Sequence, residues 1–92
     1  MATTNIPATY EHIVSTAFDG GEGVLVDLNT KRYYQLNETA MLVWHSLEKS
    51  LSIPEIVREM TATYEVSENH AANSIEKVLR ELQTYRLVRP RS

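Results

Sequence analysis

The stretch Gly23-Val-Leu-Val-Asp-Leu-Asn-Thr-Lys-Arg-Tyr-Tyr-Gln-Leu-Asn-Glu-Thr-Ala-Met-Leu-Val-Trp44 predicts a β-hairpin that runs directly into a capped helix. Residues 24–29 alternate between two faces with a period of two, which is typical of a strand with one better-buried face. An Asn-Thr pair at 29–30 suits the turn, because Asn tolerates left-handed backbone and bonds its own main chain. Residues 31–36 then return as a second strand. Nothing in this stretch looks catalytic, so a strand whose free edge takes a guest peptide is the better lead.

The end of this stretch contains two neighbouring tyrosines and a predicted helix cap. Tyr33 and Tyr34 are neighbours in a strand, so their rings point to opposite faces. Asn37 is expected to cap a helix over about 38–48, and Glu38 lies favourably at its positive end. The apolar side chains of this helix recur at i, i+3, i+4 and i+7 and form one stripe: Ala40, Val43, Trp44 and Leu47.

The rest of the chain adds one strand and two helices. Residues 1–9 are polar and are expected to be loose or extended, and residues 10–18 are rich in the β-branched and aromatic types that suit a first strand. A Ser-Ile-Pro-Glu run at 52–55 predicts a capping box and a second helix that ends near Thr63. A third helix is expected over about 68–85 after a serine cap, and its apolar stripe comprises Ala71, Ala72, Ile75, Val78, Leu79 and Leu82.

This order of elements predicts an α+β domain in which a three-stranded antiparallel sheet is followed by three helices. Such a sheet has one face to bury, and three short amphipathic helices can cover it in a second layer. The second and third helices, joined by a short turn, form a helix-turn-helix-like pair. A chain of 92 residues suffices for one modest core, so residues 10–89 are expected to form a single domain.

Composition points to a cytoplasmic protein. The chain has no cysteine, which excludes a disulfide framework, a thiolate metal site and a cysteine nucleophile. The longest apolar runs are far too short to span a bilayer, so no membrane partner is expected. The beginning of the chain has neither a basic start nor an apolar segment of the kind found in signal peptides.

Most templates for catalysis fail on this chain. The three histidines, at 12, 45 and 70, are far apart, and none has the spacing of a metal-binding pair. No Gly-x-Ser-x-Gly elbow surrounds a serine. The run Gly20-Gly21-Glu22-Gly23 lacks the Lys-Ser/Thr of a phosphate loop and precedes a strand rather than a helix. We therefore expect no enzyme activity, no metal and no cofactor.

Nucleic-acid binding is the main alternative, because a helix-turn-helix with a small sheet can be a winged-helix reader. The third helix argues against it, since Glu68, Glu76 and Glu81 oppose only two cations, which makes phosphate neutralisation weak. Its first turns offer no Arg or Lys to read bases. A weaker option is a subunit whose apolar surface only holds a partner enzyme.

Charge is unevenly distributed along the chain. Residues 1–76 carry about −7 and residues 77–92 about +4, with a net charge of −3. The plain interpretation is a solvated helix face and tail. The sharper interpretation is a small basic patch, with Lys77, Arg80 and Arg86, that steers an acidic partner.

An ordered set of short motifs carries a resemblance to a known family. The chain resembles the PqqD-like family, the peptide-recognition domains of ribosomally made and post-translationally modified peptide pathways. The resemblance covers about residues 12–88. The motifs are Leu25-Val-Asp, Tyr33-Tyr-Gln-Leu-Asn-Glu-Thr-Ala, Val43-Trp44, Ser52-Ile-Pro-Glu-Ile-Val, Tyr64-Glu-Val-Ser and the closing helix with Leu87-Val88.

The resemblance implies a winged-helix-like fold and a non-catalytic function. In this family the leader segment of a precursor peptide is added as a strand to the third strand, beside the third helix. The domain then presents the precursor to a modifying or leader-cleaving enzyme, such as a leader peptidase, a cyclase or a radical enzyme. On this chain it implies twelve contact residues: Lys31, Arg32, Tyr33, Tyr34, Gln35, Leu36, Ala72, Ile75, Glu76, Leu79, Arg80 and Gln83.

One sequence difference indicates which branch of the family this chain resembles more. The pyrroloquinoline quinone synthesis members usually have a Tyr-Pro-Glu-Gly-like run where this chain has Asp27-Leu-Asn-Thr-Lys-Arg. This difference speaks against a quinone pathway. The spacing of the Tyr-Tyr-x-Leu-Asn motif and the helix with Trp44 look more like the small stand-alone recognition proteins of lasso-peptide clusters.

Overall fold

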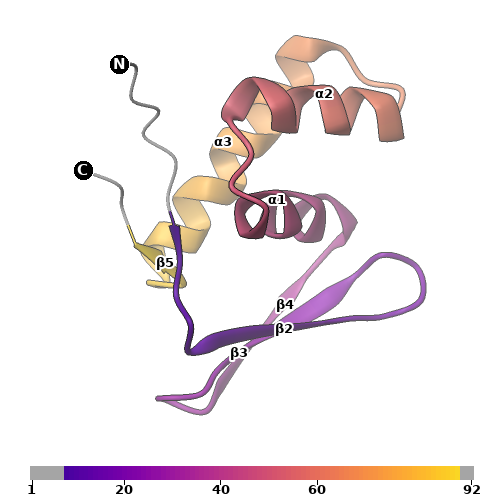
Figure 1. The fold of residues 1–92 in the computed structure, drawn as a ribbon. Coiled ribbons are helices and arrows are strands. Elements are labelled where there is room, and N and C mark those ends of the chain that lie inside the picture. Colours follow the sequence, from indigo (N-terminus) through magenta and orange to yellow (C-terminus); the bar gives the residue numbers. More distant parts are fainter. Residues whose placement is uncertain (1–7, 90–92) are drawn as a thin grey trace.

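The computed structural model describes residues 8–89, which form five strands and three helices. Figure 1 shows the helices on one side of the larger sheet, with the two shortest strands side by side. In chain order the elements are β1 (Ala8–Thr9), β2 (Ile13–Ala17), β3 (Gly23–Asp27), β4 (Arg32–Leu36), α1 (Glu38–Glu48), α2 (Ile53–Thr63), α3 (Glu68–Thr84) and β5 (Val88–Arg89). The predicted α+β class, with a three-stranded antiparallel sheet followed by three helices, is confirmed.

The larger sheet has the strand order β2-β3-β4, so β3 is central and β4 lies at an edge. In one cross-strand row Val26 lies between Val14 and Tyr33. Leu25 and Asp27 share the inner side of the strand and are buried, whereas the valines at 24 and 26 face outward and are half-buried. The better-buried face of this strand is therefore the one with fewer apolar side chains, and the valines lie on the face away from the helices.

The second sheet joins the two ends of the described chain. Ala8 pairs with Arg89 and Thr9 with Val88. Ala8 and Thr9 belong to the segment expected to be loose or extended, whose residues 1–7 lie outside the described part. A turn at 11–12 separates β1 from β2, so β2 begins at 13 rather than at 10. Strands of two residues are too short to show a period in the sequence, which is why the chain carries no signal for them.

The predicted helix starts are confirmed. Asn37 Oδ1 accepts a hydrogen bond from a first-turn N–H of α1 at 2.9 Å. Ser52 and Glu55 form both halves of the capping box, at 3.3 Å for the Glu55 N–H to the serine hydroxyl and 2.7 Å for the Ser52 N–H to the carboxylate. The Ser67 hydroxyl accepts an N–H of α3 at 3.1 Å. Each cap satisfies backbone donors that a helix start leaves free.

Two helix ends use left-handed residues that are not glycine. Ser50 follows α1 with φ 59°, and Arg86 follows α3 with φ 58°. After α3 the N–H of Leu87 donates to the carbonyl of Leu82 at 2.9 Å, as in a Schellman motif. Leu87 is thereby folded back into the core, where it is buried. The helix stops at 84, one residue earlier than predicted.

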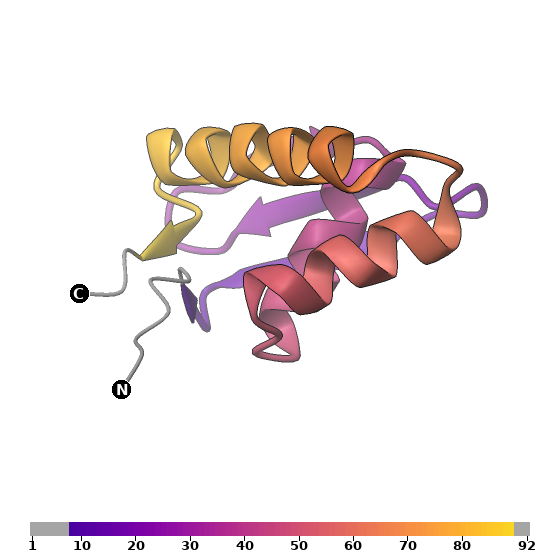
Figure 2. The same ribbon diagram turned by 90° about the horizontal axis from the view of Figure 1, so that it is seen from above.

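The core lies between the inner sheet face and the helices. Trp44 of α1 is fully buried and shares one apolar cluster with Leu25 of β3 and Ile75 of α3. Figure 2 shows α2 beside α3, and α1 packs against both. All four residues of the predicted α1 stripe are buried, whereas Ala72 in the predicted α3 stripe is exposed. No helix among the described residues is long and apolar enough to cross a membrane.

Candidate functional site

A groove runs between β4 and α3 and consists of two adjoining hollows of about 370 and 330 Å³. Five residues line both hollows: Gln35, Leu36, Ala40, Val78 and Glu81. One hollow, called here the polar end, adds Asn37, Thr39, Ser74 and Lys77. The other, called the apolar end, adds Tyr33, Tyr34, Leu82, Tyr85 and Leu87. Each hollow has room for a guest side chain.

One wall of this groove is an edge strand. Within residues 8–89 no strand pairs with the outer side of β4, since the sheet ends there. An edge strand presents unpaired N–H and C=O groups that can bond another extended chain. The groove therefore combines backbone hydrogen-bonding groups on one side with helix side chains on the other.

Tyr33 and Tyr34 have different surroundings, as predicted from their positions in the strand. Tyr34 is half-buried, and its ring centre lies 5.6 Å from that of Tyr85 at the apolar end. Tyr33 is 72% exposed and shares the outer sheet row with Val14 and Val26. Of these two tyrosines, Tyr34 is thus the one whose ring forms a groove wall, together with that of Tyr85.

The turn that leads into β4 is held by a buried carboxylate. Asp27 Oδ1 accepts the N–H groups of Asn29 at 2.8 Å and of Thr30 at 3.1 Å. The left-handed residue of this turn is Lys31, with φ 65°, rather than the asparagine. Burial opposes ionisation of Asp27, but the two backbone donors and nearby His12 outweigh it, so the pKa of Asp27 lies below its ordinary value.

The structure does not bring the twelve predicted contact residues together at one site. Those at 33–36 line the groove, whereas Lys31 lies in the turn and Arg32 is exposed at the start of β4. Ala72, Ile75, Glu76 and Leu79 line a different hollow of about 300 Å³, together with Ile53 and Asn73. Arg80 and Gln83 are exposed and line neither hollow of the groove.

Helix geometry explains this division. With 3.6 residues per turn, the buried stripe of α3 through Ala71, Ile75 and Leu82 has two flanks. One flank, with Ser74, Lys77, Val78, Glu81 and Tyr85, faces β4, and the other carries Ala72, Glu76 and Leu79. Periodicity reveals both flanks, but it does not reveal which of them faces the strand. The α1 residues of the groove follow the cap that ends β4, a proximity that the sequence does suggest.

Both charged residues that line the groove are on α3. Lys77 and Glu81 line it, and neither forms an ion pair with any described residue. Arg80 lies 4.0 Å from Glu76 on the exposed side of the helix. This contact between two exposed side chains contributes little to stability. Lys77 is therefore the groove's one cation among the described residues, and Glu81 is its one carboxylate.

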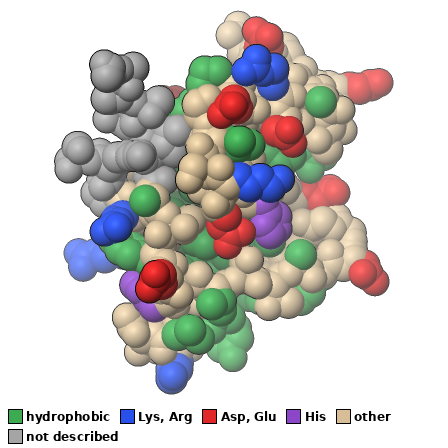
Figure 3. All heavy atoms as spheres, viewed as in Figure 1, with side chains coloured by type: hydrophobic (Ala, Val, Ile, Leu, Met, Phe, Trp, Pro, Cys, Tyr) green, Lys and Arg blue, Asp and Glu red, His purple; other side chains and the backbone are tan. Residues whose placement is uncertain are grey.

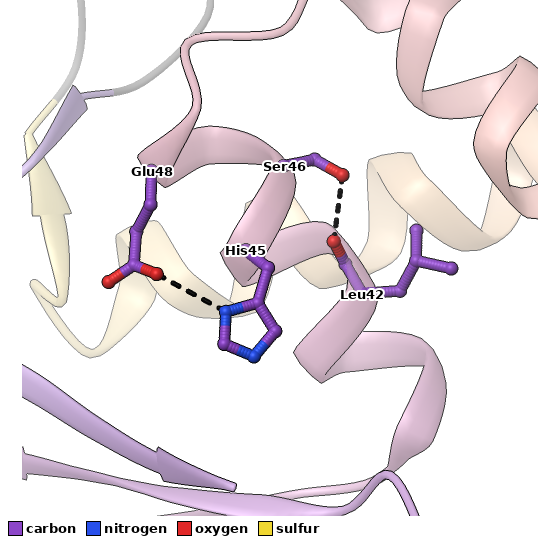
Figure 4. Close-up of polar contacts among 4 residues, drawn as sticks. All are labelled: Leu42, His45, Ser46 and Glu48. Carbon is purple, nitrogen blue, oxygen red and sulfur yellow. Dashed lines mark hydrogen bonds and ion pairs between the residues drawn. The ribbon is translucent and has the colours of Figure 1, made fainter.

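The histidines occupy unrelated positions. His45 Nδ1 lies 3.2 Å from a carboxylate oxygen of Glu48, and beside it the Ser46 hydroxyl donates to the Leu42 carbonyl at 2.8 Å (Figure 4). Across residues 8–89 no three His, Cys, Asp or Glu side chains gather in a way that could hold a metal ion.

The outer face of the sheet is uncharged. Its outward side chains on β2, β3 and β4 are Val14, Thr16, Val24, Val26, Tyr33 and Gln35. Phe18 and Leu28, in the adjoining turns, are also about half exposed, at 49% and 46%. Figure 3 shows hydrophobic side chains gathered over the lower part of the molecule, where the sheet lies. None of the six outward strand side chains is charged, and the exposed Glu22 lies in the adjoining turn across from Phe18.

Comparison with known proteins identifies the family. The family model described as coenzyme PQQ synthesis protein D (PqqD) matches residues 22–88, so the chain belongs to the PqqD family. Among curated protein sequences none matches the chain.

Two solved structures share its fold. One is TbiB1 in complex with the TbiA(beta) leader peptide, at 28% identity over 88% of this chain and 93% of that one, with a TM-score of 0.79. The other is lasso peptide synthetase B1 complexed with the leader peptide, at 28% identity over 88% and 94%, with a TM-score of 0.77. The resemblance to stand-alone lasso-type members of the family, expected from the sequence, is confirmed.

Proposed function

We propose that this protein binds the leader segment of a ribosomally made precursor peptide and presents it to a modifying or leader-cleaving enzyme. The observation that carries the proposal is the free edge of β4 beside a groove, in a PqqD-family chain that is similar to two leader-peptide complexes. The leader would extend the sheet by one strand.

The physics of strand addition fits this groove. Main-chain hydrogen bonds to β4 supply affinity, and pockets for alternate side chains supply specificity. The aromatic walls at the apolar end, Tyr34 and Tyr85, are of the type that contributes most at binding sites. The guest would replace water on the exposed edge of β4.

Presentation requires a second surface, and the uncharged outer sheet face is our candidate. A strand added to β4 would continue the rows that contain Val26 and Tyr33, so an enzyme docked there would contact protein and peptide together. The enzyme would be a leader peptidase, a cyclase or a radical enzyme, and the chain itself would act as a binding module without catalysis. Because its ligand is a newly made ribosomal peptide, we place the protein in the cytoplasm.

Two tryptophan substitutions on α3 test the binding site. Ser74→Trp would fill the groove, whereas Ala72→Trp would fill the hollow on the opposite flank. A lasso-precursor leader peptide labelled with a fluorophore, of the kind bound in the two similar structures, is titrated with each variant. We expect Ser74→Trp to abolish binding and Ala72→Trp to leave the Kd within about twofold. Circular dichroism checks that both variants are folded, and loss of binding only in Ala72→Trp would move the site to the other flank.

A further inference from the structure

The two ends of the groove differ in chemistry, and they lie in a fixed order along β4. Tyr34 lines the apolar end, and Leu36 lies two residues further on, where the polar end begins. Both side chains are half-buried on the inner face of the sheet. Beyond Leu36 the strand runs into Asn37 and α1. The groove therefore has a direction that a guest strand can read.

Strand geometry relates this order to the sequence of a guest. Side chains on one face of a strand recur every second residue, about 6.7 Å apart. A guest paired with β4 directs alternate side chains between the strand and α3. Two successive inward side chains then meet different ends of the groove, one beside Tyr34 and Tyr85 and the other beside Lys77.

The polar end is rich in hydrogen-bond donors. Lys77 carries an ammonium group that no described carboxylate pairs. The side-chain oxygen of Asn37 is already taken by the N–H of Ala40, so its free group is the NH₂ donor. Ser74 adds a hydroxyl, which can also donate. A guest side chain that accepts hydrogen bonds and carries negative charge satisfies all three.

The single carboxylate of the groove limits where an acidic guest side chain can lie. Glu81 lies one turn after Lys77 on α3 and lines both ends. It repels a second acid from the apolar end, where no other lining residue among 8–89 is a cation. An acidic side chain is therefore favoured only at the end beside Lys77.

We infer that the groove selects an extended peptide with an acidic side chain two residues from an apolar one, and that Lys77 is the residue that specifies the acid. The inference rests on the proposed function and adds to it the chemical class of the bound segment. The acid precedes the apolar residue if the guest runs antiparallel to β4, and follows it if the guest is parallel.

The test uses a random 12-residue peptide display library selected on the whole protein. The wild-type protein should enrich peptides in which Asp or Glu stands two positions from Leu, Ile, Val or an aromatic residue. With the enriched peptide, Lys77→Glu should weaken binding about tenfold, and Lys77→Gln less. With the same peptide carrying Gln in place of its acid, all three proteins should bind within about twofold of one another.

Arg80→Glu is the matched control. Arg80 has the same charge on the same helix but lines neither hollow of the groove, so its reversal should change the Kd less than twofold. Enriched peptides without the acid, or an acid preference that survives Lys77→Glu, would overturn the inference and leave the proposed function standing. If no peptide is enriched, or if Ser74→Trp does not weaken the enriched peptide, the proposed function fails as well.

Discussion

Single residues in left-handed backbone store conformational strain in this protein. Ser50 adopts φ 59° at the position after α1 where glycine is usual. Ser50→Gly should raise the free energy of unfolding by up to about 1 kcal/mol, because glycine adopts this conformation without steric conflict. Urea denaturation measures the change. Lys49→Gly, one residue earlier at φ −88°, is the control and should lower the free energy of unfolding instead.

Asp27 makes the stability of the turn before β4 depend on pH. Its pKa is depressed in the folded protein, so its contribution to stability is present above the ordinary value of 3.8 and is lost as the pH falls through the lower folded pKa. Asp27→Asn should therefore be less stable than wild type at pH 6, and the gap should close below pH about 3.8. Thermal unfolding of both proteins from pH 7 to pH 2 measures it. An undiminished gap at pH 2 would show that the carboxylate charge is not what holds the turn.

At the scale of elements, the sequence predicts the three-stranded sheet and all three helices, because caps and periodicity are local signals. Ser52, Glu55 and Ser67 act within a few residues of where they stand. The side of α3 that meets β4 is a non-local property. It depends on how α3 crosses the sheet. For this reason the contact residues expected from the sequence omit Lys77 and Val78, which line the groove, and include Ala72 and Leu79, which line the hollow on the other flank.

We expect the two faces of the larger sheet to have different roles: the inner face, beside α3, binds the leader, and the outer face binds the partner enzyme. Tyr34→Ala removes a wall of the apolar end and should weaken leader binding by about tenfold or more. Val14→Glu puts a charge on the outer face of β2, away from β4, and should leave leader affinity unchanged while it slows processing by the partner enzyme. Titration and a processing assay measure the two effects. Normal processing by folded Val14→Glu would place the enzyme on another surface.

At the scale of the whole molecule, the negative net charge favours a peptide ligand over duplex DNA. A net charge of −3 and an α3 that carries both signs give little attraction to phosphates. We expect no binding to duplex DNA at physiological ionic strength, and leader binding that changes only modestly with salt. Titration of both ligands at two salt concentrations measures this. Tight, steeply salt-dependent duplex binding would favour the winged-helix alternative.

The pairing of the first strand with the last strand is also a property of the whole molecule. The pairing of β1 with β5 brings together Ala8 and Arg89, the first and last residues of the described part. The guanidinium carbon of Arg89 lies 5.9 Å from the ring centre of Tyr10, and that ring is tilted by 31° to the His12 ring, with centres 5.0 Å apart. Pairings between such distant residues have no counterpart in a local sequence pattern, and only the complete fold reveals them.

Backbone amide hydrogen exchange, followed by NMR with and without the leader peptide, tests strand addition most directly. If the leader pairs with the edge of β4, alternate amides of residues 32–36 should gain protection on binding, and those of β2 at the other edge should not. A leader that binds tightly while the β4 amides exchange at unchanged rates would contradict strand addition at this site.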